Sequence, residues 1–304
     1  MAKKIGIEHL PLRRKTSNAN NRLSTIDWVI LVILVLFALM IIFPFYNALL
    51  VSLSPQSVVD STPLLLVPKQ ITFDAYNYVL HNQRIWNGFK VTMVLLTLGT
   101  VYQLFFTVIT GYALSRNNWF GKNFVMDMIL VTMFFGGGLI PYYYLILNLG
   151  LDDTIWVMII PGAIDTFNML LMRNYFASLP KELEESAKID GANDITIFLK
   201  IYLPLSLPML ATIGLFFAVG NWNSWYNASL YINVNQHLKP LQLVLKEIMA
   251  EASKQEQAVS GNVEVLDKNV KMAAIFFTII PMMSFYPFLQ RYFVKGIVVG
   301  AIKG

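Results

Sequence analysis

Cysteine is missing from this sequence, and its absence excludes three kinds of protein. A chain without cysteine cannot be a disulfide-stapled domain, hold a metal through thiolates or use a cysteine nucleophile. Charge is also scarce, because Asp, Glu, Lys and Arg make up 13% of the 304 residues and hydrophobic residues make up 56%. Soluble proteins carry roughly 25% charged residues. We therefore expect a protein whose surface faces a lipid bilayer.

Motifs for catalysis and nucleotide binding are missing as well. No Gly-x4-Gly-Lys-Ser/Thr loop occurs, so we expect this chain to bind no ATP and no other cofactor. The histidines at 9, 81 and 237 are scattered, and no zinc-protease or serine-hydrolase motif is present, so we expect neither a metal site nor an enzyme. The net charge of +5 comes from short basic clusters between apolar runs, which argues against a nucleic-acid surface.

Long apolar runs are what the chain does have. The first carries no charge over 24 residues, and as a helix of about 36 Å it exceeds the roughly 30 Å hydrocarbon core. Two later runs are weaker, because polar residues at 220–223 and prolines at 281 and 287 interrupt them. The predicted fold class is an all-α polytopic membrane protein with six transmembrane helices. The predicted spans are 28–51, 91–115, 128–149, 154–172, 203–226 and 272–289.

Helix-breaking residues lie inside these runs, so we expect kinked helices. The run Gly136-Gly137-Gly138 before Pro141 allows close helix packing or a bend, and the alternative is direct contact with a ligand.

The positions of the basic residues predict the orientation. Loops rich in Lys and Arg stay in the cytoplasm. Fifteen of the 23 Lys and Arg fall on the side that holds both termini, and eight fall on the other side. Both termini are therefore expected in the cytoplasm. The predicted organisation is a cytoplasmic segment 1–27, a membrane domain 28–304, a cytoplasmic loop 173–203, extracellular loops 52–90 and 227–271, and a cytoplasmic tail 290–304.

The loop 173–203 has the pattern of a helix, a turn and a second helix. Ser178 can cap the first helix, and Glu182, Glu184 and Glu185 suit its positive N-terminal end. Gly191 suits a left-handed residue after that helix, and Asn193 or Asp194 can cap the next one. An apolar stripe follows at positions 195, 198 and 199. From the pattern alone, the loop is either a knob for a partner or an amphipathic segment packed under its own bundle.

The spacing of residues in this loop resembles the EAA motif of permease subunits of ABC-type importers. Glu185-Ser186-Ala187 is followed after three residues by Gly191, and after nine more by Ile201-Tyr-Leu-Pro204. Ser186 departs from the usual alanine, although it is also small. The stretch 179–192 resembles the carbohydrate-uptake branch, and the stretches 135–141 and 290–296 resemble its members for oligosaccharides and polysaccharide fragments.

This resemblance implies a non-catalytic subunit in a prokaryotic cell membrane. Its implied partners are a second homologous permease chain, in a heterodimer, two ATP-binding subunits that hold ATP-Mg, and an extracellular lipoprotein-type solute-binding protein. The implied substrate is an oligosaccharide. The loop would dock on the ATPase, and the implied coupling residues are Glu184, Glu185, Ser186, Ala187, Asp190, Gly191 and Ala192.

Sugars are bound by aromatic faces together with amide or carboxylate groups. The segment with Asn221, Trp222, Asn223, Trp225 and Tyr226 supplies that mixture near the outer end of the fifth span, where an interfacial aromatic belt is the alternative. Tyr143, between two further tyrosines, is a second candidate of the same kind.

Asp165 is a carboxylate inside the fourth predicted span. It is a candidate for the substrate path, and structural pairing or a hydrogen bond near Asn168 is its alternative. The same carboxylate motivates a rival function, an ion-coupled secondary transporter or channel.

Overall fold

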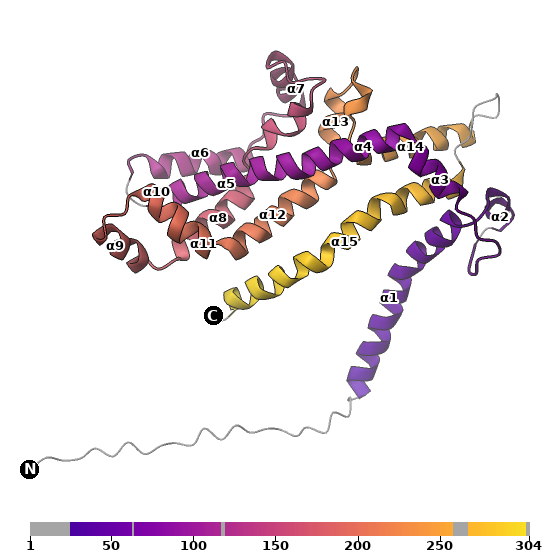
Figure 1. The fold of residues 1–304 in the computed structure, drawn as a ribbon, viewed down its shortest axis with the longest axis horizontal. Helices are drawn as coiled ribbons and strands as arrows, with labels where there is room; N and C mark the ends of the chain where they lie inside the picture. Colours follow the sequence, from indigo (N-terminus) through magenta and orange to yellow (C-terminus); the bar gives the residue numbers. More distant parts are fainter. Residues whose placement is uncertain (1–24, 63, 117–118, 258–266, 302–304) are drawn as a thin grey trace, which may run out of the picture. The chain divides into compact units, whose positions relative to one another are not determined.

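The structure is a computed structural model, and it describes residues 25–62, 64–116, 119–257 and 267–301, with the backbone alone at 251–257 and 285–301. All regular secondary structure in these ranges is helical (Figure 1). The chain divides into two compact units, residues 1–47 and 48–304, which are described separately. The predicted all-α fold class is confirmed.

The first unit contains most of α1 (Thr25–Ser52), a helix of 28 residues with Pro44 inside it. Its side chains from Trp28 to Phe45 are exposed, and they are apolar around the whole circumference. A helix that is apolar on every side is typical of a membrane span. The first predicted span, 28–51, is therefore confirmed as one continuous helix.

The second unit begins with the last turn of α1 and the short helices α2 (Gln56–Ser61) and α3 (Asp74–His81). A continuous helix of 33 residues follows, and by length and composition it too can cross a membrane. It consists of α4 (Gln83–Val94), the π-helical turn η1 (Leu95–Gly99) and α5 (Thr100–Ser115). This helix contains the second predicted span.

The third, fourth and fifth predicted spans are broken helices. The pair α6 (Lys122–Phe134) and α7 (Leu139–Asn148) meets at 114°. The turns η2 (Ile155–Met158) and η3 (Ile160–Gly162) precede α8 (Thr166–Ser178), with a bend of 42°. The segment from α10 (Asp194–Ile197) through η4 (Phe198–Tyr202) and α11 (Leu203–Leu205) meets α12 (Leu207–Trp222) and α13 (Tyr226–Tyr231) at 77°.

The bends follow from helix-breaking residues. Gly138 has φ +88°, a conformation that glycine adopts readily, and it separates α6 from α7. Of the two alternatives predicted for the glycine run, the bend is therefore the one found, and within the described part of this chain a Cβ added at Gly136 or Gly137 would meet nothing within 4 Å. The kink expected in the predicted span 154–172 is confirmed, because a bend of 42° divides this segment. Pro161 has no N–H to donate, and the chain there forms two short 3-10 turns.

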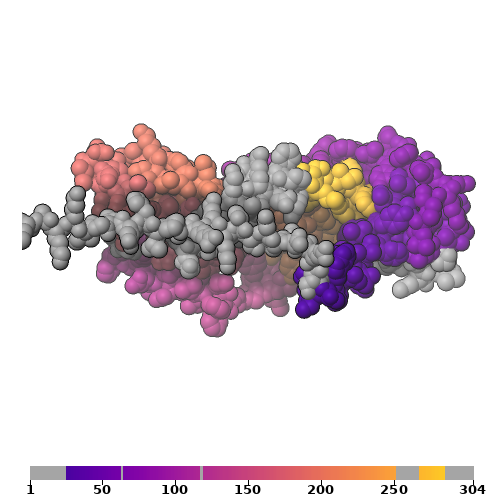
Figure 2. Space-filling model, turned by 90° about the horizontal axis from the view of Figure 1, so that it is seen from below, coloured from indigo at the N-terminus to yellow at the C-terminus, as the bar shows by residue number. Residues whose placement is uncertain are grey.

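The last elements are η5 (Gln236–Leu238), α14 (Leu241–Gln257) and α15 (Lys268–Ala301), which covers the sixth predicted span. Helix α14 lies along α4, and α15 packs on α3 (Figure 1). Figure 2 shows the yellow residues of α15 against the purple segment that includes α3 and α4. Buried residues of these four helices form one core cluster. A second cluster joins α5, α8 and α12 to the segment 187–203.

Candidate functional site

Helix α9 (Glu182–Ile189) is the first helix of the predicted loop. Glu182, Glu184 and Glu185 occupy its first turn, as predicted. The predicted cap at Ser178 is wrong, because Ser178 ends α8 and its hydroxyl donates to the Tyr175 carbonyl at 2.7 Å. The reason is the proline at 180. The residue before a proline avoids the helical region, and Leu179 is extended, so the new helix begins only after Lys181.

The turn after α9 is closed by main-chain hydrogen bonds. The Gly191 N–H donates to the Lys188 carbonyl at 3.0 Å, and the Ala192 N–H donates to the Ala187 carbonyl at 2.9 Å. This pair of bonds is a Schellman motif, which needs a left-handed residue at the position that Gly191 occupies with φ +80°. Asn193 then caps α10 by accepting from the Thr196 N–H at 2.8 Å. The predictions for Gly191 and Asn193 are confirmed.

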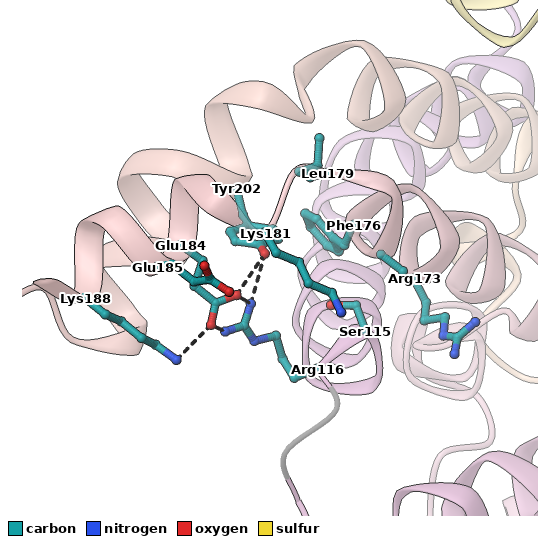
Figure 3. Close-up of a pocket in the computed structure, with 11 residues that line it drawn as sticks. Ser115, Arg116, Arg173, Phe176, Leu179, Lys181, Glu184, Glu185, Lys188 and Tyr202 are labelled. Atoms are coloured by element: carbon teal, nitrogen blue, oxygen red, sulfur yellow. Dashed lines mark hydrogen bonds and ion pairs between the residues drawn. The ribbon is translucent and has the colours of Figure 1, made fainter. Parts of the chain in front are cut away.

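Glu184 fixes α9 to the rest of the molecule (Figure 3). Its two carboxylate oxygens accept from the two terminal nitrogens of Arg116, at the end of α5. The Tyr202 hydroxyl of η4 donates to the same carboxylate at 3.1 Å, and the Lys188 ammonium lies 2.8 Å from it. Only 13% of the Glu184 side chain is exposed. Paired, partly buried charges of this kind hold elements in a defined geometry.

Aromatic rings enclose the same ion pair, which we call the Arg116–Glu184 lock. The guanidinium carbon of Arg116 lies 5.4 Å from the ring centroids of both Tyr112 and Tyr202. These contacts are at the distance of cation–π interactions. Nothing in the local sequence indicated Arg116, which lies 68 residues from Glu184 in the chain, whereas Tyr202 belongs to the same loop and to the motif quoted from it. A cavity of about 430 Å³ adjoins the lock and is lined also by Arg173 and Lys181.

The opposite side of the loop is exposed and apolar. Leu183 is 42% exposed, Ile189 is 87% exposed and Ile195 is 69% exposed. Glu185, Ser186, Asp190 and Gly191 are exposed beside them, whereas Ala187 and Ala192 pack inward against the core. The predicted stripe is divided, because Phe198 packs on Tyr112 at 4.7 Å between ring centroids while Ile195 and Leu199 face outward. The loop is thus packed on its own bundle along one side and open along the other.

The aromatic segment after α12 opens into a groove of about 640 Å³. Its wall comes from three helices, α12, α14 and α15, and from the turn before α13. The lining residues are Trp222, Asn223, Trp225, Gln242, Leu245, Lys246, Met249, Ile275, Thr278, Ile279, Met282 and Met283. Three of the predicted sugar-contact residues therefore meet in one place: Trp222, Asn223 and Trp225.

Polar residues that were not predicted from the sequence also line this groove. Gln242 and Lys246 are four residues apart on α14, and Thr278 is on α15. The apolar spacing of 241, 244, 245 and 248 indicates a helix there, and residues four apart on a helix share a face. That pattern could have placed Gln242 and Lys246 together, but not against Trp225.

The other residues predicted to contact sugar make their contacts within the protein, outside the groove. Asn221 is buried and donates to the Thr100 hydroxyl at 3.1 Å and to the Gln103 side-chain carbonyl at 2.9 Å, which ties α12 to α5. Tyr143 stacks on Tyr231 with ring centroids 5.3 Å apart and belongs to a core cluster. Tyr226 is exposed and meets only the edge of the neighbouring Trp225 ring among the described aromatic contacts.

Asp165 caps a helix. Its carboxylate accepts from the Asn168 N–H at 2.8 Å and satisfies the first turn of α8. The side chain is exposed and does not line the groove. The alternative of a hydrogen bond near Asn168 is therefore the one that the structure shows.

Comparisons with known proteins identify the family. Residues 19–299 match the family described as binding-protein-dependent transport system inner membrane component. The chain belongs to this family. It is a permease component of an ABC transporter, embedded in the membrane, and such a system works with a solute-binding protein, an ATPase and a permease partner. The predicted family resemblance is confirmed, and the ion-coupled alternative has no support left.

The relatives include permeases that are named for carbohydrates. The polygalacturonan/rhamnogalacturonan transport system permease YtcP of Bacillus subtilis is 38% identical over 91% of this chain and 98% of its own length. The arabinooligosaccharides transport system permease AraQ of Halalkalibacterium halodurans is 27% identical over 96% of this chain and 100% of its own. A crystal structure of a bacterial ABC transporter involved in the import of the acidic polysaccharide alginate matches with a TM-score of 0.80. Its identity is 34%, over 88% of this chain and 96% of that one.

Proposed function

We propose that this permease moves oligosaccharides or polysaccharide fragments, and that the loop 173–203 receives the motion of the ATPase. The substrate class rests on the relatives, which are named for polygalacturonan, rhamnogalacturonan and arabinooligosaccharides. The finer assembly is a heterodimer of permeases with two ATPase subunits and a lipoprotein-type binding protein. In it, ATP hydrolysis belongs to the partners, and this chain is non-catalytic.

The observation that carries the coupling role is the two-sided construction of α9. The Arg116–Glu184 lock joins the inner side of this helix to α5 and η4, so a push on α9 reaches helices of the membrane domain. The outer side offers Leu183 and Ile189 to a partner. Exposed apolar residues of this size, beside the polar Glu185 and Asp190, are typical of a protein interface. Glu185, Ser186, Ala187, Asp190, Gly191 and Ala192 form or support that outer side, and Glu184 acts from the inner side.

Substitutions at Gly191, in the turn after α9, test the coupling role. Valine resists the left-handed conformation that Gly191 adopts, whereas asparagine tolerates it. We expect Gly191→Val to abolish substrate-stimulated ATP hydrolysis by the reconstituted complex, and Gly191→Asn to retain most of it. Gly150→Val is the matched control, since Gly150 also has a positive φ of +63° and open space around it but lies far from this loop in the chain. Normal stimulation in Gly191→Val would refute the coupling role.

The orientation remains a proposal with its own test. We infer cytoplasmic termini and a cytoplasmic loop 173–203 from the fifteen basic residues on that side against eight on the other. Reporter fusions after Lys188 should score as cytoplasmic, and fusions within 52–90 as extracellular. The reverse pattern would overturn the orientation.

The groove is the substrate contact that we infer in this chain. It combines two tryptophans with the amides of Asn223 and Gln242 in a mostly apolar wall, which is the mixture that sugar binding requires. Trp222, Asn223 and Trp225 keep the role predicted for them. Asp165, Asn221, Tyr143 and Tyr226 are assigned structural roles in this proposal, because their contacts lie outside the groove.

A further inference from the structure

Among the described residues that line the groove, Lys246 is the one that carries a charge. Its ammonium nitrogen lies 3.2 Å from the centroid of the Trp225 ring. No ion pair within the described part of the chain includes Lys246. The ammonium is therefore held over an aromatic face with its charge uncompensated by the groove.

The neighbouring acid does not neutralise this charge. Glu247 follows Lys246 in the sequence, but its carboxylate pairs with Arg84 of α4 at 3.3 Å and also with the Lys239 ammonium. These partners hold Glu247 on the side of α14 that faces α4. Adjacent residues on a helix point in different directions, so Lys246 is left facing the groove.

Close packing fixes the position of α14 and hence of Lys246. The Leu241 N–H, at the start of α14, donates to the buried Thr92 hydroxyl of α4 at 2.9 Å. Gly88 permits this approach, because a Cβ there would lie 3.0 Å from the Leu241 Cα. The cation therefore stands on a helix that is anchored to its neighbour.

We propose that Lys246 binds a carboxylate of the transported sugar, so that the groove is a subsite for an acidic, uronate-type residue. The ammonium is a strong donor to a carboxylate. The apolar wall made by Leu245, Ile279 and Met282 suits the C–H face of the sugar ring, and the Asn223 and Gln242 amides suit its hydroxyls. Two of the related systems are named for polygalacturonan and for the acidic polysaccharide alginate, which carry such carboxylates.

This inference rests on the proposed function, and the experiment separates the two. The full complex, with its partner subunits and binding protein, is reconstituted in proteoliposomes. The probes are trigalacturonate and its fully methyl-esterified form, which has the same skeleton without charge. The measurement is the ratio of ATPase stimulation by the acid to stimulation by the ester, both at saturating binding protein. Because every variant meets the same binding protein, a changed ratio reports on the permease.

We expect Lys246→Met to lower the acid-to-ester ratio about tenfold, as for the loss of a charge-assisted hydrogen bond. Lys246→Arg should keep the ratio within about twofold, since it retains the charge. Lys90→Met is the matched control, because Lys90 is an exposed lysine on the neighbouring α4 that does not line the groove, and its ratio should stay at the parental value.

Three results would count against these ideas. An unchanged acid-to-ester ratio in Lys246→Met, including an equal fall in ATPase stimulation with both probes, overturns the carboxylate-binding role while leaving the proposed function in place. If neither probe stimulates the parental complex, transport of galacturonate oligosaccharides is rejected, and the subsite is rejected with it. Where Lys246→Met fails to co-purify with its partners, Lys246→Gln takes its place under the same criteria.

Discussion

The Arg116–Glu184 lock and the groove treat charge in opposite ways. At the lock, Arg116, Glu184 and Lys188 satisfy one another within the chain, and little of the central carboxylate is exposed. In the groove, the charge of Lys246 has an aromatic ring beneath it, and the described lining residues include no carboxylate. Paired charge fixes geometry, whereas unpaired charge is available to a ligand. Removing a charge should therefore cost stability at the lock and selectivity in the groove.

The largest effect on stability is expected at the lock. Glu184→Ala leaves the Arg116 charge partly buried without a partner, and loss of one member of a buried pair costs about 3–5 kcal/mol. Discounting for its partial exposure, we expect roughly 2–3 kcal/mol in the unfolding free energy of the complex, measured by thermal or denaturant unfolding in detergent.

Glu185→Ala is the matched control for that change. Its side chain is exposed at the cavity beside the lock but belongs to none of the ion pairs described there, and surface changes of this kind usually fall within about 0.5 kcal/mol. Equal losses of stability in the Glu184 and Glu185 variants would contradict the structural role of the lock.

The second-largest effect on stability is expected for a buried amide, in contrast to an amide that lines the groove. Asn221→Ala removes both hydrogen bonds to Thr100 and Gln103 and should cost about 1–3 kcal/mol, because buried polar groups are left without partners. Asn223→Ala, two residues away and exposed, should change stability little and transport more. Unfolding midpoints and uptake rates of the two variants test this division. If Asn223→Ala were the less stable protein, the division would be wrong.

The third effect concerns the aromatic wall of the groove. Trp225→Ala removes both the ring under Lys246 and a surface for stacking, which is worth on the order of 1 kcal/mol, so transport should fall several-fold. Trp222 is buried against Phe89, with ring centroids 6.4 Å apart, so Trp222→Ala should also reduce assembly. Co-purification yield and uptake by assembled complex separate the two effects. Parental uptake by both assembled variants would remove the groove from the substrate path.

The smallest effect on stability is expected at Asp153, where a charge is held by main-chain hydrogen bonds. Its carboxylate accepts from the N–H groups of Val234, Asn235 and Asn233, and these hydrogen bonds hold its pKa below the ordinary value of 3.8. A carboxylate with a depressed folded pKa stabilises the fold above its unfolded pKa. That contribution should disappear as pH falls from about 4 through the lower folded value.

Limited proteolysis in the segment 232–239 between pH 5 and pH 2 measures this loss. Asp153→Asn keeps an acceptor oxygen but does not titrate as a carboxylate. The difference in protection between the parent and Asp153→Asn should therefore vanish at the acid end. A constant difference across the range would exclude the carboxylate as its source.

Sequence prediction succeeded where the determinants are local. The turn at Gly191 and the cap at Asn193 depend on a few neighbouring residues, and both were found. The first span was found because its apolar character is continuous. The cap at Ser178 failed on an equally local effect, the extension that a proline imposes on the residue before it.

The remaining misses depend on long-range packing. Arg116 and Glu184 are 68 residues apart in the chain, and no periodic pattern connects them. The groove joins Trp225, Lys246 and Thr278 from three elements, so composition could identify only the aromatic part of it. For Asp165, the sequence left open both a substrate contact and a hydrogen bond near Asn168, and the break in this run makes the carboxylate the cap of the helix that follows.

The Schellman turn at Gly191 has a consequence for how such importers can diversify. The turn is closed by main-chain donors and acceptors, and the only side chain that its shape demands is the hydrogen atom of glycine. The outward residues Leu183 and Ile189 take no part in it. In the proposed coupling role, the residues of the outer surface can therefore change to fit a different ATPase, because the main-chain turn beneath them does not depend on their side chains.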